Sequence, residues 1–178
     1  AHISQKVLTV SGNTASNKIY DGSSSATVTV SLSGFIGSET LTYTNSSSFN
    51  NKNVGAGKTV TVNSIILADG ANGGLATNYS VTTGQTTTAN ITAKALTVSG
   101  ITSSSKTYNG STSATLDTTS VIYSGLVSGD TFNGSYTGAF SNANVGAVKT
   151  VTITSSYAGA DVNNLSLIHI SEPTRLHG

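Results

Sequence analysis

An internal duplication constrains this chain more than any other feature of its sequence. The segment KVLTVSG at residues 6–12 returns as KALTVSG at residues 94–100, and KIYDGSSSAT at residues 18–27 returns as KTYNGSTSAT at residues 106–115. The period is about 90 residues, whereas solenoid repeats run about 20–50 residues. Each copy therefore has the length of one small all-β domain.

Two further motifs follow in the same order in each copy. GFIGSE at residues 34–39 matches GLVSGD at residues 125–130, and FNNKNVGAGKTVTV at residues 49–62 matches FSNANVGAVKTVTI at residues 140–153. Because the order of the motifs is the same in both halves, we predict two tandem domains of one type.

The junction between the copies predicts where each domain begins. The chain starts AHISQKVLTV, and the join between the copies reads ANITAKALTV. Residues 1–5 are therefore predicted to be the last strand of a preceding copy, followed by domain 1 at residues 6–93 and domain 2 at residues 94–164. We expect the parent protein to be an array of at least three such units with almost no linker between them.

The sequence changes character after Asn164. The last segment, LSLIHISEPTRLHG at residues 165–178, holds the only Pro, the only Arg and two of the three His of the chain. Its first eleven residues resemble the translation of the end of a transposase-type DNA-sequencing adapter. We therefore expect residues 165–178 to be an adapter-derived, non-native tail of a metagenomic fragment. The alternative is a genuine C-terminal strand and tail.

On the adapter interpretation, domain 2 is truncated and lacks the counterparts of TNYSVTT and TTTANIT in domain 1. The alternation of Leu165 and Leu167 could still let this segment act as a substitute strand. His169, Glu172 and His177 are given no functional role.

Alternation of apolar and polar residues dominates both copies. Leu8 and Val10 share one face of KVLTVSG, and Val28, Val30 and Leu32 share one face of the next alternating segment. Charged residues are only 8% of the chain, and Thr supplies polar strand positions without charge. We predict an all-β protein of about six to eight short strands per copy, folded as two tandem antiparallel β-sandwich (Ig-like) domains. A β-grasp-like sheet is the alternative.

Composition excludes several classes of function. The net charge is +1 and there is no Cys, which gives no electrostatic case for binding nucleic acid or an anionic membrane and leaves no thiolate metal site. No apolar run approaches the roughly 20 residues of a membrane helix. We expect no enzyme activity, no cofactor and no metal. At Asp69, an Asx turn is favoured over a calcium site formed with Asn72 and Asn78.

The most strongly repeated phrase is predicted to be a structural turn, formed in the two copies by Tyr20, Asp21, Gly22, Tyr108, Asn109 and Gly110. Asp and Asn accept hydrogen bonds from nearby backbone N–H groups, and Gly permits positive φ. The exchange of Asp21 for Asn109 argues against acid–base chemistry, because Asn cannot exchange a proton. The two Tyr rings are expected to pack beside their turns; stacking on carbohydrate is the alternative.

Four motifs together resemble the YDG-type repeat of large bacterial surface adhesins, such as proteins like filamentous haemagglutinin: KIYDGSSSAT, GSETL/GDTF, FNNKNVGAGKTVTV and NYSVTT…ITAKALTV. The resemblance covers residues 6–164 and departs from the pattern at Asn109. It implies a secreted protein on the outer surface of a bacterium, in which such repeats form a stalk. It implies no catalytic residues.

Two functions are compatible with these observations. The first is a structural spacer that presents a distal binding region and whose partners are neighbouring repeats of the same chain. The second is an adhesive module that contacts glycans or host proteins through residues 70–77 and 128–138. Phe132 and Tyr136 are the only aromatic candidates in those loops, and the first loop has none. This asymmetry favours the spacer.

Overall fold

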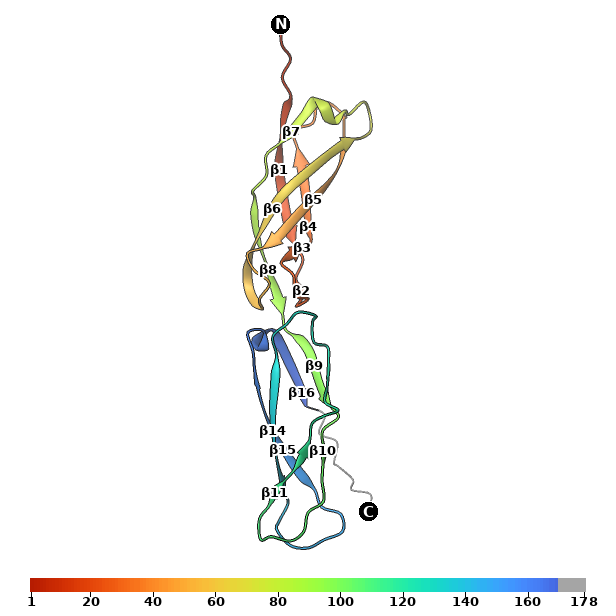
Figure 1. Cartoon of the computed structure of the whole chain (residues 1–178). Coiled ribbons are helices and arrows are strands. Elements are labelled where there is room, and N and C mark those ends of the chain that lie inside the picture. The colour runs from red at the N-terminus through yellow and green to blue at the C-terminus, as the bar shows by residue number, and fades with distance from the viewer. Residues whose placement is uncertain (170–178) are drawn as a thin grey trace. The chain divides into compact units, whose positions relative to one another are not determined.

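The computed structural model describes residues 1–169 and divides the chain into unit 1, Ala1–Thr92, and unit 2, Ala93–Gly178. Within the described residues, each unit contains eight β-strands and one short 3-10 turn (Figure 1). No α-helix forms within residues 1–169, and none of the helical segments there is long and apolar enough to cross a membrane. The all-β prediction is confirmed.

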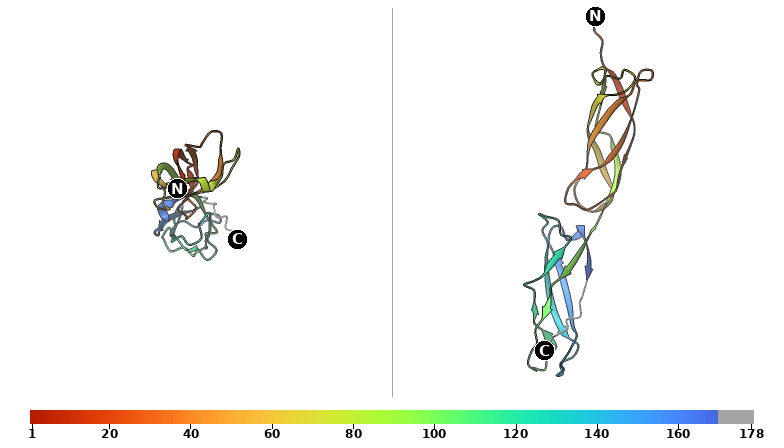
Figure 2. Two further views of the ribbon diagram at one scale, coloured as in Figure 1. Left: turned by 90° about the horizontal axis from the view of Figure 1, so that it is seen from above. Right: turned by 90° about the vertical axis from the view of Figure 1, so that its right-hand side faces the viewer.

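Unit 1 is built from two sheets whose strands run along the length of the unit (Figure 2). The first has the order β4-β1-β7 and the second the order β2-β8-β6-β5-β3. The strands are β1 (Lys6–Ala15), β2 (Lys18–Ile19), β3 (Ser25–Ala26), β4 (Val28–Ser33), β5 (Leu41–Phe49), β6 (Gly55–Asp69), β7 (Tyr79–Val81) and β8 (Thr86–Thr92).

The core of unit 1 lies between these sheets, as the period-two pattern requires. Leu8 of β1, Leu41 of β5 and Tyr79 of β7 form one buried cluster. A second group of buried residues lies toward the other end of the strands, on β8 and its neighbours. It comprises Tyr20, Phe49, Val60, Val62, Ala89 and Ile91. The arrangement is consistent with a β-sandwich.

Not every pairing in unit 1 is antiparallel, and here the prediction needs a correction. β7 pairs with β1 in parallel, and so does β8 with β2. Parallel neighbours need a long connection between them. The chain has such a connection in both cases, because it forms strands of the opposite sheet between the two strands that pair.

Unit 2 repeats this plan with fewer paired strands, in sheets of order β13-β9-β16, β11-β14-β15 and β10-β12. Its strands are β9 (Lys94–Ser99), β10 (Thr102–Ser103), β11 (Ser113–Ala114), β12 (Leu116–Asp117), β13 (Ile122–Ser124), β14 (Asn133–Phe140), β15 (Val151–Ala158) and β16 (Leu165–His169). The sheet β11-β14-β15 matches β3-β5-β6 of unit 1. Within residues 93–169, no strand occupies the places of β2 and β8.

The start of the C-terminal segment does form the substitute strand that its alternation predicted. β16 pairs in parallel with β9, with Leu165 opposite Lys94 and Leu167 opposite Leu96. This is the register in which Tyr79 and Val81 of β7 pair with β1. The structural correspondence between the copies therefore continues past Asn164, where the recognisable sequence match ends. Glu172 and His177 lie outside the described residues.

Candidate functional site

The YDG turn, residues 18–23 in unit 1 and 106–111 in unit 2, is held by a lysine. In unit 1 the Lys18 ammonium lies 2.8 Å from Asp21 Oδ1 and donates to the Ser23 carbonyl at 2.8 Å. Asp21 Oδ1 also accepts the Ser23 backbone N–H and hydroxyl, both at 2.9 Å. One carboxylate oxygen thus collects three donors within six residues, which closes the turn.

Unit 2 builds the same network around an amide oxygen instead of a carboxylate. Lys106 donates to Asn109 Oδ1 at 3.0 Å and to the Ser111 carbonyl at 2.7 Å. Asn109 Oδ1 accepts the Ser111 backbone N–H at 3.1 Å and the Ser111 hydroxyl at 3.0 Å. The position therefore needs an acceptor oxygen and has no need of a titratable group.

The glycine of each turn is required by its backbone. Gly22 has φ of 80° and Gly110 has φ of 76°, in the left-handed region that residues with a Cβ rarely adopt. The turn geometry expected at these positions is therefore present in both units.

Only unit 1 places a charge on the acceptor. Burial raises the pKa of Asp21, but the hydrogen bonds from Lys18 and Ser23 outweigh this, and the pKa lies below its ordinary value of 3.8. The side chain remains about half exposed, so water screens much of this interaction.

A second lysine holds the neighbouring loop, here called the NVG loop, residues 49–58 in unit 1 and 140–149 in unit 2. Lys58 donates to Asn51 Oδ1 at 2.6 Å, and the same oxygen accepts the Asn53 backbone N–H at 3.0 Å. In unit 2 Lys149 donates to Asn142 Oδ1 and to the Asn144 carbonyl. Of the three lysine positions that recur in the two units, these two therefore serve loop closure.

The first residue of the NVG loop ties it to the YDG turn. The Lys18 ammonium lies 5.6 Å from the centre of the Phe49 ring, and the Lys106 ammonium 5.5 Å from that of Phe140. These distances suit a cation–π contact. The lysines were not singled out in the sequence. The sequence did contain a signal for their role, because a lysine stands three residues before both Asp21 and Asn109.

The two tyrosines of the repeated phrase do not share one environment. Tyr20 is 1% exposed, and its backbone N–H donates to the Thr92 carbonyl of β8 at 2.8 Å. Tyr108 is 65% exposed. The Tyr20 ring is therefore buried and the Tyr108 ring mostly exposed. In the described part of unit 2, no strand in the place of β8 covers Tyr108.

At the other end of unit 1, a buried tyrosine meets a carboxylate. The Tyr79 hydroxyl donates to Glu39 Oε2 at 2.5 Å and accepts the Ile36 backbone N–H at 3.1 Å. The hydrogen bond to Glu39 raises the pKa of Tyr79. Leu165 takes this position in unit 2 and brings no hydroxyl, so this pair is not part of a shared site.

Two of the three residues considered for calcium, Asp69 and Asn72, use their side chains for loop closure in the structure. Asp69 Oδ1 accepts the Ala76 backbone N–H at 2.8 Å, and the Asn72 side chain donates to the Ser38 carbonyl at 3.0 Å. The acceptor contact spans seven residues, so the Asx turn expected at Asp69 is wrong in its detail. In residues 1–169 no group of three or more His, Cys, Asp or Glu side chains could hold a metal.

The aromatic candidates for an adhesive loop pack against other aromatic rings. Phe132 stacks on Tyr157 with ring centres 5.4 Å apart, and the Tyr136 hydroxyl lies 3.0 Å from that of Tyr123. Burial, and then the Tyr123 hydroxyl, raises the pKa of Tyr136 well above its ordinary value. These side chains form a half-buried cluster and are not displayed for stacking on a ligand.

The comparisons with known proteins agree with the repeated geometry. The family model described as the YDG domain matches residues 4–89 and again residues 92–174. No curated protein and no solved structure matches the chain. The two matches together span nearly the whole sequence and fall on the two units that carry the lysine-held turns. The chain belongs to the YDG domain family and contains two copies of that domain.

Proposed function

We propose that the two YDG domains are structural spacer repeats of a secreted bacterial surface adhesin. In this role they hold a distal binding region away from the cell, and they act outside the cell with no enzymatic step. Their partners are the neighbouring repeats of the same chain.

One observation carries the proposal. The polar residues that recur most faithfully hydrogen-bond to one another within the YDG turns and NVG loops, in the same pattern in both units. Recognition and catalytic sites need polar groups that face a ligand. Here the repeated groups face each other, as expected of residues that maintain a fold.

An adhesive module that binds glycans or host proteins directly is the competing function. The packing of Phe132 and Tyr136 among other rings argues against these two residues as ligand-stacking groups. The exposed ring of Tyr108 is the remaining one.

Binding of the purified chain to immobilised glycans and to host cells separates the two functions. A spacer should show no saturable binding, and Tyr108→Ala should behave like the original chain. Saturable binding that Tyr108→Ala abolishes would overturn the spacer and establish a direct adhesive role.

A further inference from the structure

The YDG turn of unit 2 contains an asparagine followed directly by a glycine, Asn109 and Gly110. Such a pair is chemically labile. The backbone nitrogen of the second residue can attack the side-chain carbon Cγ of the asparagine, and glycine has no Cβ to hinder the approach. The chain contains three of these pairs, which begin at Asn72, Asn109 and Asn133. Their surroundings differ, so we expect their reactivity to differ.

The side chain of Asn109 is held in a way that activates its carbonyl group. Its Oδ1 accepts the Lys106 ammonium at 3.0 Å, the Ser111 backbone N–H at 3.1 Å and the Ser111 hydroxyl at 3.0 Å. When a nucleophile adds to Cγ, negative charge develops on this oxygen. Donors that already point at the oxygen stabilise that charge, as they do in an oxyanion hole.

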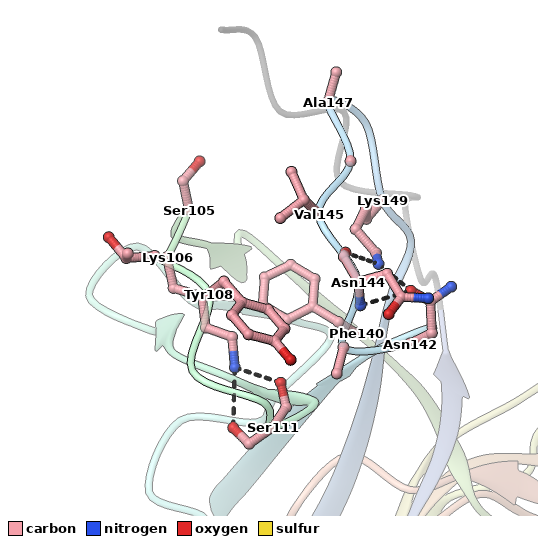
Figure 3. A pocket seen from close by; sticks show the side chains of 13 residues that line it. Ser105, Lys106, Tyr108, Ser111, Phe140, Asn142, Asn144, Val145, Ala147 and Lys149 are labelled. Atoms are coloured by element: carbon pink, nitrogen blue, oxygen red, sulfur yellow. Dashed lines mark hydrogen bonds between the residues drawn. The ribbon is translucent and has the colours of Figure 1, made fainter.

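Further contacts fix Lys106 in this position. Its ammonium donates to the Ser111 carbonyl at 2.7 Å and to the Ser113 carbonyl at 2.9 Å, and it lies 5.5 Å from the centre of the Phe140 ring. Figure 3 shows Lys106 hydrogen-bonded to Ser111. The cation is therefore in place before charge develops on Asn109, and no rearrangement is needed to bring it there.

The nucleophile and the water that the reaction needs are both accessible. Among the hydrogen bonds of residues 1–169, none is donated by the Gly110 backbone N–H. Apart from its chain neighbours, nothing lies within 4 Å of the place that a Cβ on Gly110 would occupy. Asp21, at the position of Asn109, is about half exposed in unit 1. Because β8 is present there, exposure of this position does not depend on whether that strand is filled.

The other two asparagine–glycine pairs lack this arrangement. Asn133 and Gly134 lie in β14, paired with β15, and the Tyr136 hydroxyl fills the space beside Gly134. The side-chain nitrogen of Asn72, which would have to leave, donates to the Ser38 carbonyl at 3.0 Å. Within residues 1–169, neither of these two asparagines has three donors on its Oδ1.

We propose that Asn109 is a deamidation site, at which unit 2 converts its own turn from YNG to the YDG form of unit 1. The Gly110 nitrogen bonds to Cγ of Asn109, its proton passes through water to the amide nitrogen, and ammonia leaves, so that a cyclic imide forms. Water then adds to Cγ, the bond from Cγ to the Gly110 nitrogen breaks, and that nitrogen regains a proton. One water is consumed for each ammonia released. This modification is independent of the proposed spacer function.

The same donors direct the opening of the cyclic imide. Addition of water at Cγ gives aspartate, whereas addition at the backbone carbonyl carbon of residue 109 gives isoaspartate and lengthens the main chain. Lys106 and Ser111 polarise the carbonyl of Cγ, so they favour aspartate. The new carboxylate takes the place that Asp21 occupies in unit 1, where its oxygen accepts donors from Lys18 and Ser23.

Peptide mapping by mass spectrometry of the whole chain, incubated at neutral pH, tests the proposal. Each asparagine–glycine pair is followed in the folded chain and in guanidinium chloride, so that every site has its own unfolded reference. Asn109 should react faster in the folded chain than in denaturant, whereas Asn72 and Asn133 should react more slowly. The ratio of aspartate to isoaspartate at residue 109 should also be higher in the folded chain. A folded rate at Asn109 that is equal to or below the rate in denaturant overturns the proposal.

Replacement of the lysine distinguishes activation from protection. Lys106→Met should slow the reaction at Asn109 roughly fivefold, as expected for the loss of an exposed charged donor. Ser111→Ala keeps the backbone donor and should slow the reaction less. If the turn only protects Asn109, Lys106→Met will accelerate the reaction, and this outcome overturns the proposal.

Lys149→Met is the matched control. Lys149 donates to Asn142, which is followed by alanine instead of glycine. Its replacement should leave the rate at Asn109 unchanged, and an equal slowing in this variant would overturn the role of Lys106. In every variant, unchanged rates at Asn72 and Asn133 show that both units are still folded.

Discussion

Unit 1 and unit 2 close their YDG turns in the same way, yet they treat the tyrosine inside the turn in opposite ways. Tyr20 is 1% exposed and Tyr108 is 65% exposed. The difference teaches that the turn is a local structure, complete within six residues. The burial of its tyrosine is not local, since it depends on β8, which comes from the end of the domain.

Replacing the two tyrosines should give the largest difference in stability loss between the two units. Tyr20→Ala should destabilise unit 1 by about 3–5 kcal/mol, because a buried aromatic ring is lost. Tyr108→Ala should change the stability of unit 2 by no more than about 0.5 kcal/mol. Residue-resolved hydrogen exchange of the whole chain at low concentration measures both. Equal costs would mean that Tyr108 is buried in solution.

Replacing the glycine of each YDG turn should destabilise the two units by similar amounts. Gly22→Val and Gly110→Val should each cost about 1–3 kcal/mol, because a β-branched residue is strained at positive φ. Gly110→Asn should cost clearly less, since Asn tolerates the left-handed region. The same exchange measurement reports these costs, and an unaffected Gly110→Val variant would place φ at negative values.

The lysine of the YDG turn should matter about equally in both units. Lys18→Met and Lys106→Met should each cost about 1–2 kcal/mol, because hydrogen bonds from a charged group are lost while the apolar part of the side chain is kept. A cost confined to Lys18→Met would show that attraction to the Asp21 carboxylate, and not the shared hydrogen bonds, holds the turn.

Lowering the pH should give the smallest difference in local stability between the two YDG turns. The pKa of Asp21 is lowered by folding, so its contribution is present above the ordinary value of 3.8 and is lost as the pH falls through the lower folded value. Exchange protection of the Ser23 amide should fall below about pH 4, by less than about 1 kcal/mol. The Ser111 amide, bound to Asn109, should not respond, and Asp21→Asn should abolish the response of Ser23.

The all-β fold and the division into two units could be predicted because both follow from short sequence patterns that recur in the two copies. The alternation around Leu8 and Val30 marks strands whatever their neighbours are. The roles of Asp21 and Gly22 followed from the chemistry of short turns. The exchange of Asp21 for Asn109 indicated an acceptor oxygen, and the side-chain oxygen accepts hydrogen bonds in both turns.

The rest depends on contacts between residues far apart in the chain. The sequence of neither strand alone indicates that β7 pairs with β1 in parallel. Packing of Phe132 against Tyr157 became visible only when β14 and β15 were aligned. The role of Lys18 was readable in principle, but a lysine near a turn is usually a solvated charge. Only its four contacts distinguish it.

The positions of β1 and β8 have a consequence for a chain under tension. A pull on the two ends of unit 1 enters at Lys6, where β1 begins beside Tyr79, and leaves at Thr92, where β8 ends beside Ile19. Each of these strands is flanked on both sides, β1 by β4 and β7 and β8 by β2 and β6. Force directed along a strand loads its lateral hydrogen bonds in shear, so many must yield together and not one after another. We therefore expect unit 1 to resist being stretched between its two ends.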